Sequence, residues 1–180
     1  MLNTGLTRLN EALVEIRRVS HGLRPALLDD LGLAAALALL TEQVQAHSDC
    51  RLRFVLRGDP MPIPTSHSTA LFRVAQEALT NAQRHATNAS RIDVVLKFSG
   101  DQISLLVLDN GVGFAVRKVQ ADRKDGIGLR NMRERIGGLG GRFTITSSRF
   151  GTRMRAVLPS AEMPDSDWSP LGAPAHWAAA

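Results

Sequence analysis

Aromatic residues, cysteine and long apolar runs are all scarce in this chain of 180 residues, and each scarcity excludes a class of function. Aromatic residues make up 4% of the sequence and tyrosine is absent, so few side chains could stack on the bases of single-stranded nucleic acid. The single cysteine, Cys50, excludes an internal disulfide framework and a metal site built from several thiolates. No apolar run approaches the roughly 20 residues that span a bilayer as a helix. The hydrophobic content of 44% still predicts an ordinary folded core, and the length predicts one domain.

The charge balance is basic, with 22 Lys and Arg against 17 Asp and Glu and a formal net charge of +5. A basic balance can indicate nucleic-acid binding. In this chain the arginines are spread along the sequence and aromatic residues are few, which favours phosphate handling and ordinary solvated faces. We therefore expect no nucleic-acid partner.

Apolar periodicity predicts a succession of helices and strands. In chain order, we expect helices over 6–19 and 33–44, a strand over 51–56, a helix over 66–86, strands over 92–98 and 103–108, a helix over 129–139, and strands over 143–147 and 152–158. The strand over 103–108 is apolar on both faces, which predicts a central position in the sheet. The order predicts an α+β fold, a two-layer sandwich with helices on one face of a mixed, mainly antiparallel sheet.

The first of three motifs lies on the predicted helix over 66–86. Glu77, Asn81 and His85 are spaced four residues apart and therefore fall on one side of the helix. Arg84 falls on the same side. The Asn81 carboxamide is an oxygen ligand suited to Mg²⁺, and Glu77 can accept a proton or orient a water. Arg84 and His85 can neutralise phosphate charge. The alternative is a solvated helix face with ordinary polar residues.

The second motif follows the predicted central strand. Asp109 ends this apolar strand, where a carboxylate needs a partner, and it can accept the exocyclic amine of a purine. Gly111 and Gly113 let the backbone approach such a ring closely. The alternative is a simple turn after a strand.

The third motif is a pair of glycines, Gly126 and Gly128, before the helix expected to begin near Leu129. Backbone amides at a helix start favour anionic phosphate oxygens. The pair lacks the lysine of a P-loop and the third glycine of a dinucleotide fingerprint, so both of those sites are excluded. The polar stretch over 116–125 is predicted to act as a mobile lid. The three motifs in this order predict a pocket for Mg-ATP.

As a set, the motifs resemble the ATP-binding domain of the GHKL superfamily, which includes gyrase, heat-shock chaperone, histidine kinase and mismatch-repair ATPases. Residues 77–86 resemble its N box, 109–114 its G1 box and 126–129 its G2 box, and Gly151 with Thr152 resembles the glycine–threonine element near the end of the fold. Within the superfamily, residues 23–33, 128–135 and 139–141 resemble the nitrate-sensor-like branch of bacterial sensor histidine kinases, the branch with NarL-type partners. The likeness covers about 13–159.

This resemblance implies a Bergerat-type two-layer α/β sandwich with ATP and Mg²⁺ as cofactors. By the resemblance, Glu77 is the catalytic residue, Asn81 binds Mg²⁺ and Asp109 binds the adenine amine. The implied nucleotide-binding residues are Asn81, Arg84, His85, Asp109, Gly111, Gly113, Gly126, Ile127, Gly128, Leu129 and Thr152.

One departure from the family pattern concerns the phosphoacceptor histidine. Kinases of this branch carry it in a His-Asp pair on an earlier helix, and no histidine precedes His21 here. Gly22 and Pro25 break the helix just after His21, so we expect no phosphoacceptor in this chain. The expected organisation is the tail of a second dimerisation helix over 1–24, the catalytic domain over 25–159 and a mobile tail over 160–180.

The resulting prediction is a protein histidine kinase part that presents the γ-phosphate of Mg-ATP to a histidine on dimerisation helices, but does not phosphorylate itself when isolated. A response regulator would be the later partner. The expected location is the cytoplasm, as the cytoplasmic part of a sensor that meets the membrane only through upstream segments. Two alternatives stay open: a gyrase-like ATPase clamp, and a nucleotide-dependent interaction protein such as an anti-sigma-like serine kinase.

The isolated His47, His67 and His176 are expected to be surface or loop residues.

Overall fold

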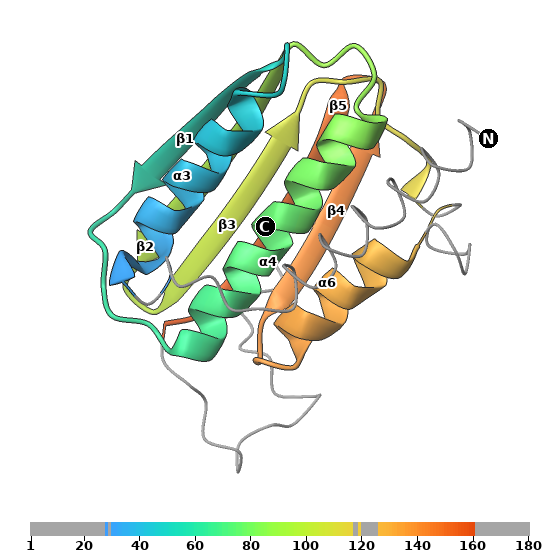
Figure 1. The fold of residues 1–180 in the computed structure, drawn as a ribbon. Coiled ribbons are helices and arrows are strands. Elements are labelled where there is room, and N and C mark those ends of the chain that lie inside the picture. Colours follow the sequence, from blue (N-terminus) through green and yellow to red (C-terminus); the bar gives the residue numbers. More distant parts are fainter. Residues whose placement is uncertain (1–27, 29, 117–118, 120–125, 161–180) are drawn as a thin grey trace, which may run out of the picture.

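The computed structural model describes residue 28, residues 30–116, residue 119 and residues 126–160. Within these residues, three helices cover one face of a five-stranded sheet (Figure 1). The elements are α3 (Gly32–Gln45), β1 (Arg51–Arg57), α4 (Thr65–His85), β2 (Arg91–Ser99), β3 (Gln102–Asp109), α6 (Ile127–Gly137), β4 (Arg142–Ser148) and β5 (Gly151–Pro159). The predicted α+β two-layer sandwich is confirmed. The helix expected over 6–19, most of the lid and nearly all of the tail lie outside the described residues. No described helix has both the length and the apolar character needed to cross a bilayer.

The strand order is β1-β2-β3-β5-β4, which places β3 at the centre, as its two apolar faces predicted. β1 pairs with β2 in parallel, because α4 crosses over between them and returns the chain in the same direction. The other three pairs are antiparallel. This topology brings the end of β3 beside the start of β5, where Asp109 is the partner of Thr152. Two of the predicted motif residues therefore become neighbours through strand pairing.

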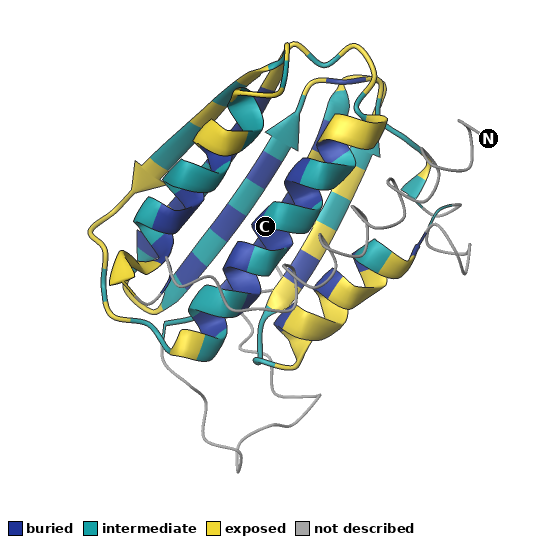
Figure 2. Cartoon of the chain, in the orientation of Figure 1, coloured by how far each residue is buried: buried dark blue, intermediate teal, exposed yellow. Residues whose placement is uncertain are grey.

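The core lies between the three helices and the sheet (Figure 2). α4 supplies its largest share, because apolar residues recur every three or four positions along one side. The buried α4 residues are His67, Ala70, Leu71, Phe72, Val74, Ala75, Ala78, Leu79 and Ala82. The facing strands bury alternate residues, such as Ile103, Leu105 and Val107 of β3. With its apolar side fixed against the sheet, α4 presents its neighbouring polar side in a defined direction.

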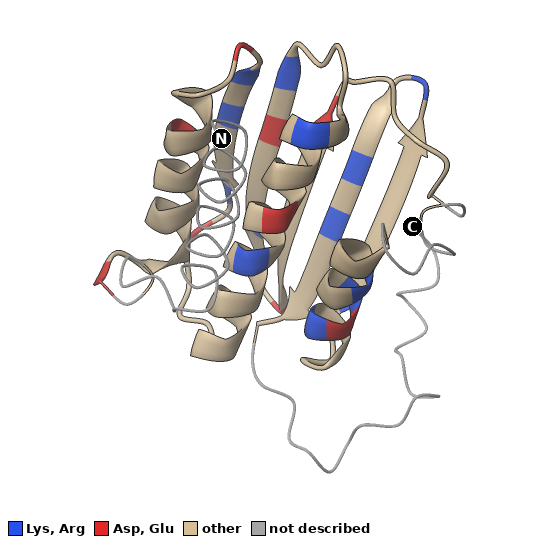
Figure 3. Ribbon diagram, turned by 45° about the vertical axis from the view of Figure 1, so that its right-hand side comes forward, with Lys and Arg blue, Asp and Glu red and all other residues tan. Residues whose placement is uncertain are grey.

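The sheet face that α3, α4 and α6 leave uncovered is basic. Strand alternation and register place on it Arg51, Arg53 and Arg57 of β1, Arg91 and Lys97 of β2, Arg142 of β4, and Arg153 and Arg155 of β5. Figure 3 shows Lys and Arg residues along these strands. Asp93 is buried on this face, where its two carboxylate oxygens accept from Arg53 Nε at 2.9 Å and Arg91 Nε at 3.0 Å. The pair with Arg53 ties β1 to β2, the pair with Arg91 lies within β2, and together they offset the burial of the carboxylate.

Helix α6 differs from its predicted bounds at both ends. It begins at Ile127, two residues early, so Gly128 lies inside its first turn rather than before the helix. It ends at Gly137 rather than at Leu139, because two consecutive glycines, Gly137 and Gly138, weaken the helix there. Gly140 then turns the chain with a φ of +71°.

One histidine lies elsewhere than the sequence pattern predicted. His67 was expected at the surface, but it is 1% exposed in the first turn of α4. It lies three and four residues before the buried Ala70 and Leu71, so it shares their side of the helix. The surface prediction for His67 is therefore wrong, whereas His47 is exposed as predicted.

Candidate functional site

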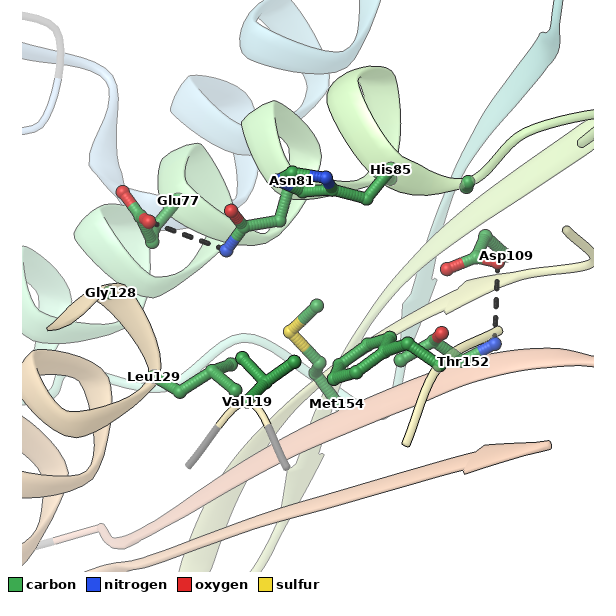
Figure 4. Close-up of a pocket in the computed structure, with 12 residues that line it drawn as sticks. Glu77, Asn81, His85, Asp109, Val119, Gly128, Leu129, Thr152 and Met154 are labelled. Atoms are coloured by element: carbon green, nitrogen blue, oxygen red, sulfur yellow. Dashed lines mark hydrogen bonds between the residues drawn. The ribbon is translucent and has the colours of Figure 1, made fainter. Parts of the chain in front are cut away.

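A cavity of about 360 Å³ lies between α4, the first turn of α6 and one end of the sheet (Figure 4). Its lining residues are Glu77, Asn81, Ala82, His85, Ala86, Asp109, Phe114, Val119, Gly128, Leu129, Thr152 and Met154. All three sequence motifs and the glycine–threonine element contribute to it. Segments that lie far apart in the chain thus converge on one hollow.

The polar side of α4 forms one wall of the cavity. Glu77, Asn81 and His85 lie on successive turns and all line it, as their spacing predicted. The Asn81 side-chain amide Nδ2 donates to Glu77 Oε1 at 3.3 Å, which leaves the carboxamide oxygen for other partners. Arg84, by contrast, is exposed near the end of the helix and does not line the cavity. Its role in binding phosphate stays a prediction.

Asp109 is held at the opposite end by backbone donors. Its Oδ1 accepts the N–H of Gly111 at 3.0 Å and the N–H of Thr152 at 3.3 Å. Figure 4 shows the other carboxylate oxygen pointing into the cavity. Because Oδ1 is already engaged, the carboxylate presents its second oxygen as an acceptor in a fixed orientation.

The glycines of the second motif pack next to Asp109, outside the cavity lining. Gly111 and Gly113 do not line the cavity. A Cβ on Gly111 would lie 2.9 Å from the Ala86 Cα, and a Cβ on Gly113, whose φ is +63°, would overlap the Ser148 carbonyl oxygen. Their absent side chains therefore let the loop after β3 pack against both α4 and the β4–β5 turn. This close packing fixes the position of Asp109, and contact of the two glycines with a ligand stays a prediction.

Ser147 links the same loop to β5. Its Oγ accepts the Phe114 N–H at 2.9 Å and lies 3.0 Å from the Thr152 Oγ1. Thr152 is 6% exposed, so its hydroxyl is satisfied inside the protein while its backbone N–H holds Asp109. The predicted site residue Thr152 thus joins three segments of the chain at this end of the cavity.

The other end of the cavity is the start of α6. Gly128 and Leu129 line it from the first helical turn, and a Cβ on Gly128 would overlap the Glu77 Oε1. The glycine therefore allows the two helices to meet closely. Gly126 precedes the first helical residue and the Ile127 side chain is 44% exposed; neither lines the cavity, so their role in binding nucleotide stays a prediction. First-turn N–H groups without intrahelical partners favour anions.

Five lining residues were not predicted as site residues, and all five are apolar: Ala82, Ala86, Phe114, Val119 and Met154. Strand alternation could have found Met154, which is two residues beyond Thr152 and therefore on the same face of β5. Helical spacing could likewise have found Ala82 and Ala86, which flank the polar side of α4. Together these residues give the cavity the apolar walls that a flat aromatic ligand requires.

Cys50 lies outside the cavity lining. Burial raises the pKa of its thiol, and the negative charge of Asp109 raises it further. The thiol is therefore protonated at neutral pH and is a poor nucleophile.

Residues 66–162 match the family of histidine kinase-, DNA gyrase B- and HSP90-like ATPases. The chain belongs to this family. The sensor histidine kinase MctS of Rhizobium johnstonii is 41% identical over 160 residues, which cover 89% of this chain and 34% of MctS. The kinase/phosphatase UhpB of Salmonella typhimurium is 35% identical over 151 residues, which cover 80% of this chain and 28% of UhpB.

A solved structure agrees with these relatives. The histidine kinase domain of the blue-light activated kinase from Erythrobacter litoralis superposes with a TM-score of 0.57 at 25% identity, covering 71% of this chain and 65% of that domain. The family match and the relatives support the ATP-binding catalytic domain of a histidine kinase, as predicted, and do not favour a clamp ATPase or a serine kinase. The chain spans about a third of the length of the two curated relatives.

Proposed function

We propose that this chain binds Mg-ATP in the cavity between α4 and the sheet and presents the γ-phosphate to a phosphoacceptor histidine on dimerisation helices. A response regulator then receives the phosphoryl group, in the manner of the NarL-partner branch, and the reaction takes place in the cytoplasm, where ATP is available. One observation carries this proposal. A fixed carboxylate, Asp109, lies at one end of an apolar-walled cavity, and Asn81 with the first turn of α6 lies at the other.

The Asp109 end suits adenine. The inward carboxylate oxygen can accept the exocyclic amine, which every adenine nucleotide carries, while the apolar walls contact the ring. A guanine base presents a carbonyl oxygen at the corresponding position and would face the carboxylate with like partial charge. The site therefore favours adenine over guanine.

The Asn81 end suits a phosphate–magnesium group. The Asn81 Nδ2 donates to Glu77, which leaves the Asn81 carboxamide oxygen available. This oxygen is a hard neutral ligand, which Mg²⁺ accepts beside waters and phosphate oxygens. The first-turn amides of α6 are available to phosphate oxygens. When bound, Mg²⁺ neutralises phosphate charge. The protein residues orient the triphosphate and exclude water from one side of it.

Glu77 is proposed as the catalytic residue of this chain. Its carboxylate lies beside both Asn81 and Gly128, at the end of the cavity where the phosphates would lie. There it can hold the Asn81 side chain in its metal-binding orientation and accept a proton from an incoming group. Phosphoryl transfer needs little more from the protein than such positioning.

The whole proposal is tested by mixing this chain with a separate dimerisation fragment that bears the phosphoacceptor histidine and adding γ-labelled ATP. We expect acid-labile label on the fragment and none on this chain when it is incubated alone. The same mixture with Asp109→Asn should transfer less label. Strong labelling of the isolated chain that vanishes in His21→Gln would overturn the assignment of the phosphoacceptor to another segment.

Asn81→Ala should separate metal handling from base recognition. We expect the affinity for Mg-ATP to fall about tenfold, because one metal ligand is lost, while the affinity for adenosine stays within about twofold. Isothermal titration calorimetry with both ligands measures this. Gln83→Ala is the matched control, since Gln83 is exposed on the same helix and outside the cavity lining. Equal losses for Mg-ATP and adenosine would assign Asn81 a purely structural role.

A further inference from the structure

A second, smaller cavity of about 140 Å³ lies between α4 and α6, next to the candidate nucleotide cavity. Its lining residues are Arg73, Gln76, Glu77, Gly128, Asn131, Met132 and Arg135. Glu77 and Gly128 line both cavities, so the second one continues the first beyond the end where the phosphates would lie. Its two arginines, Arg73 and Arg135, were not among the residues of the three sequence motifs.

The two guanidinium groups come from different helices. Arg73 lies one helical turn before Glu77 on α4 and is half-buried, and its Nη1 donates to the Gln76 Oε1 at 2.9 Å. Arg135 lies in the last turn of α6. Burial lowers the pKa of Arg73, and the positive charge of Arg135 lowers it further. Two guanidinium groups thus line one cavity, together with the carboxylate of Glu77, which itself accepts from Asn81.

An anion in this cavity would be attracted to both guanidinium groups. Guanidinium presents a planar fork of donors that matches phosphate oxygens, and it binds them in a bidentate manner more readily than an ammonium does. The volume suits a phosphoryl group and lies well below the roughly 300 Å³ at which pockets for larger ligands begin. Polar Gln76 and Asn131 are available to the remaining oxygens.

We propose that this cavity is a binding site for a phosphoryl group, held between Arg73 of α4 and Arg135 of α6. The inference deepens the proposed function and rests on it for the source of the group, the terminal phosphate of ATP. Free phosphate has the same chemistry and is the other possible source.

The spacing along α4 supports the terminal phosphate of ATP. His85, Asn81, Glu77 and Arg73 follow one another at four-residue steps, which corresponds to about 6 Å of helix each. A nucleotide whose base lies at Asp109 would extend its phosphates past Asn81 toward Glu77. The third phosphate would then be the one nearest Arg73, and a diphosphate would end short of it. The site therefore distinguishes ATP from ADP.

Arg135→Gln and Arg73→Gln test the site by calorimetry with Mg-ATP and Mg-ADP on the whole chain. We expect each variant to weaken ATP binding about tenfold and to leave ADP binding within about twofold of the unsubstituted chain. Arg133→Gln is the matched control, because Arg133 is exposed on the same helix and lies outside the cavity lining. Arg135 is itself exposed, so its replacement tests the site even if Arg73→Gln fails to fold.

The outcomes separate this inference from the proposed function. Equal losses for ATP and ADP, or no loss for either, would overturn the phosphoryl site while leaving nucleotide binding intact. If the unsubstituted chain bound neither nucleotide, the proposed function would fail. In that case, NMR shifts of backbone amides on titration with inorganic phosphate would decide whether the second cavity binds free phosphate. Shifts around Gly128 and Asn131 that vanish in Arg135→Gln and persist in Arg133→Gln would support a site for free phosphate, and their absence in the unsubstituted chain would overturn it.

Discussion

Asp109→Asn is expected to weaken ATP and ADP binding by about tenfold to a hundredfold while the domain stays folded. Asparagine keeps an oxygen that can accept the N–H groups of Gly111 and Thr152, so the loop after β3 is retained. The oxygen that points into the cavity becomes an NH₂ group, which cannot accept the adenine amine. Calorimetry measures the affinities, and thermal unfolding checks the fold.

Asp101→Asn is the matched control for this change. Asp101 is exposed in the β2–β3 turn and takes no part in the cavity, so the same loss of charge should leave affinity unchanged. An unaltered ATP affinity in Asp109→Asn would remove Asp109 from base recognition. A large loss of stability with little change in affinity would instead assign its carboxylate to holding the loop.

Gly151→Ala is expected to lower the free energy of unfolding by about 3 kcal/mol and to weaken nucleotide binding in the molecules that remain folded. Gly151 has a φ of +127°, and a Cβ there would overlap the carbonyl oxygen of Asp109. Relieving that overlap must move the start of β5 away from the end of β3. The Thr152 N–H would then withdraw from the Asp109 carboxylate.

Gly100→Ala provides the comparison for Gly151→Ala. Gly100 also has a positive φ, +50°, but a Cβ there meets no atom within 4 Å. It should therefore cost only the backbone strain, about 1 kcal/mol, and leave nucleotide affinity unchanged. Urea unfolding of both variants gives the two free energies. Equal destabilisation of the two variants would show that the close approach of Gly151 to Asp109 is unimportant.

Local periodicity predicted the elements that build the site. The apolar spacing of α4 placed Glu77, Asn81 and His85 on one side of a helix, and the structure has them lining one wall. The two apolar faces of β3 predicted its central position, and Asp109 lies at its end. These features depend on residues close in sequence, which is why a single chain reveals them.

Contacts between segments far apart in the sequence determine the features of the site that periodicity could not predict. Nothing local to β4 or β5 indicates that β5 lies between β3 and β4, yet that order brings Thr152 to Asp109. The close packing of Gly111 against Ala86 and of Gly113 against Ser148 was likewise not predicted. Arg135 and Arg73 line the same cavity only because α6 packs against α4. Such contacts between distant segments leave no periodic signal in the sequence.

Helix α4 makes the parallel crossover from β1 to β2 and also forms the wall of the nucleotide cavity. One helix thus connects two strands of the sheet and lines the binding site, so a ligand that holds α4 in place resists opening of the sheet as well. At a ligand concentration a hundred times Kd, this linkage adds about 2.7 kcal/mol to the free energy of unfolding. Strand β1 contributes no residue to the cavity lining, yet its amide protons should exchange more slowly once nucleotide is bound.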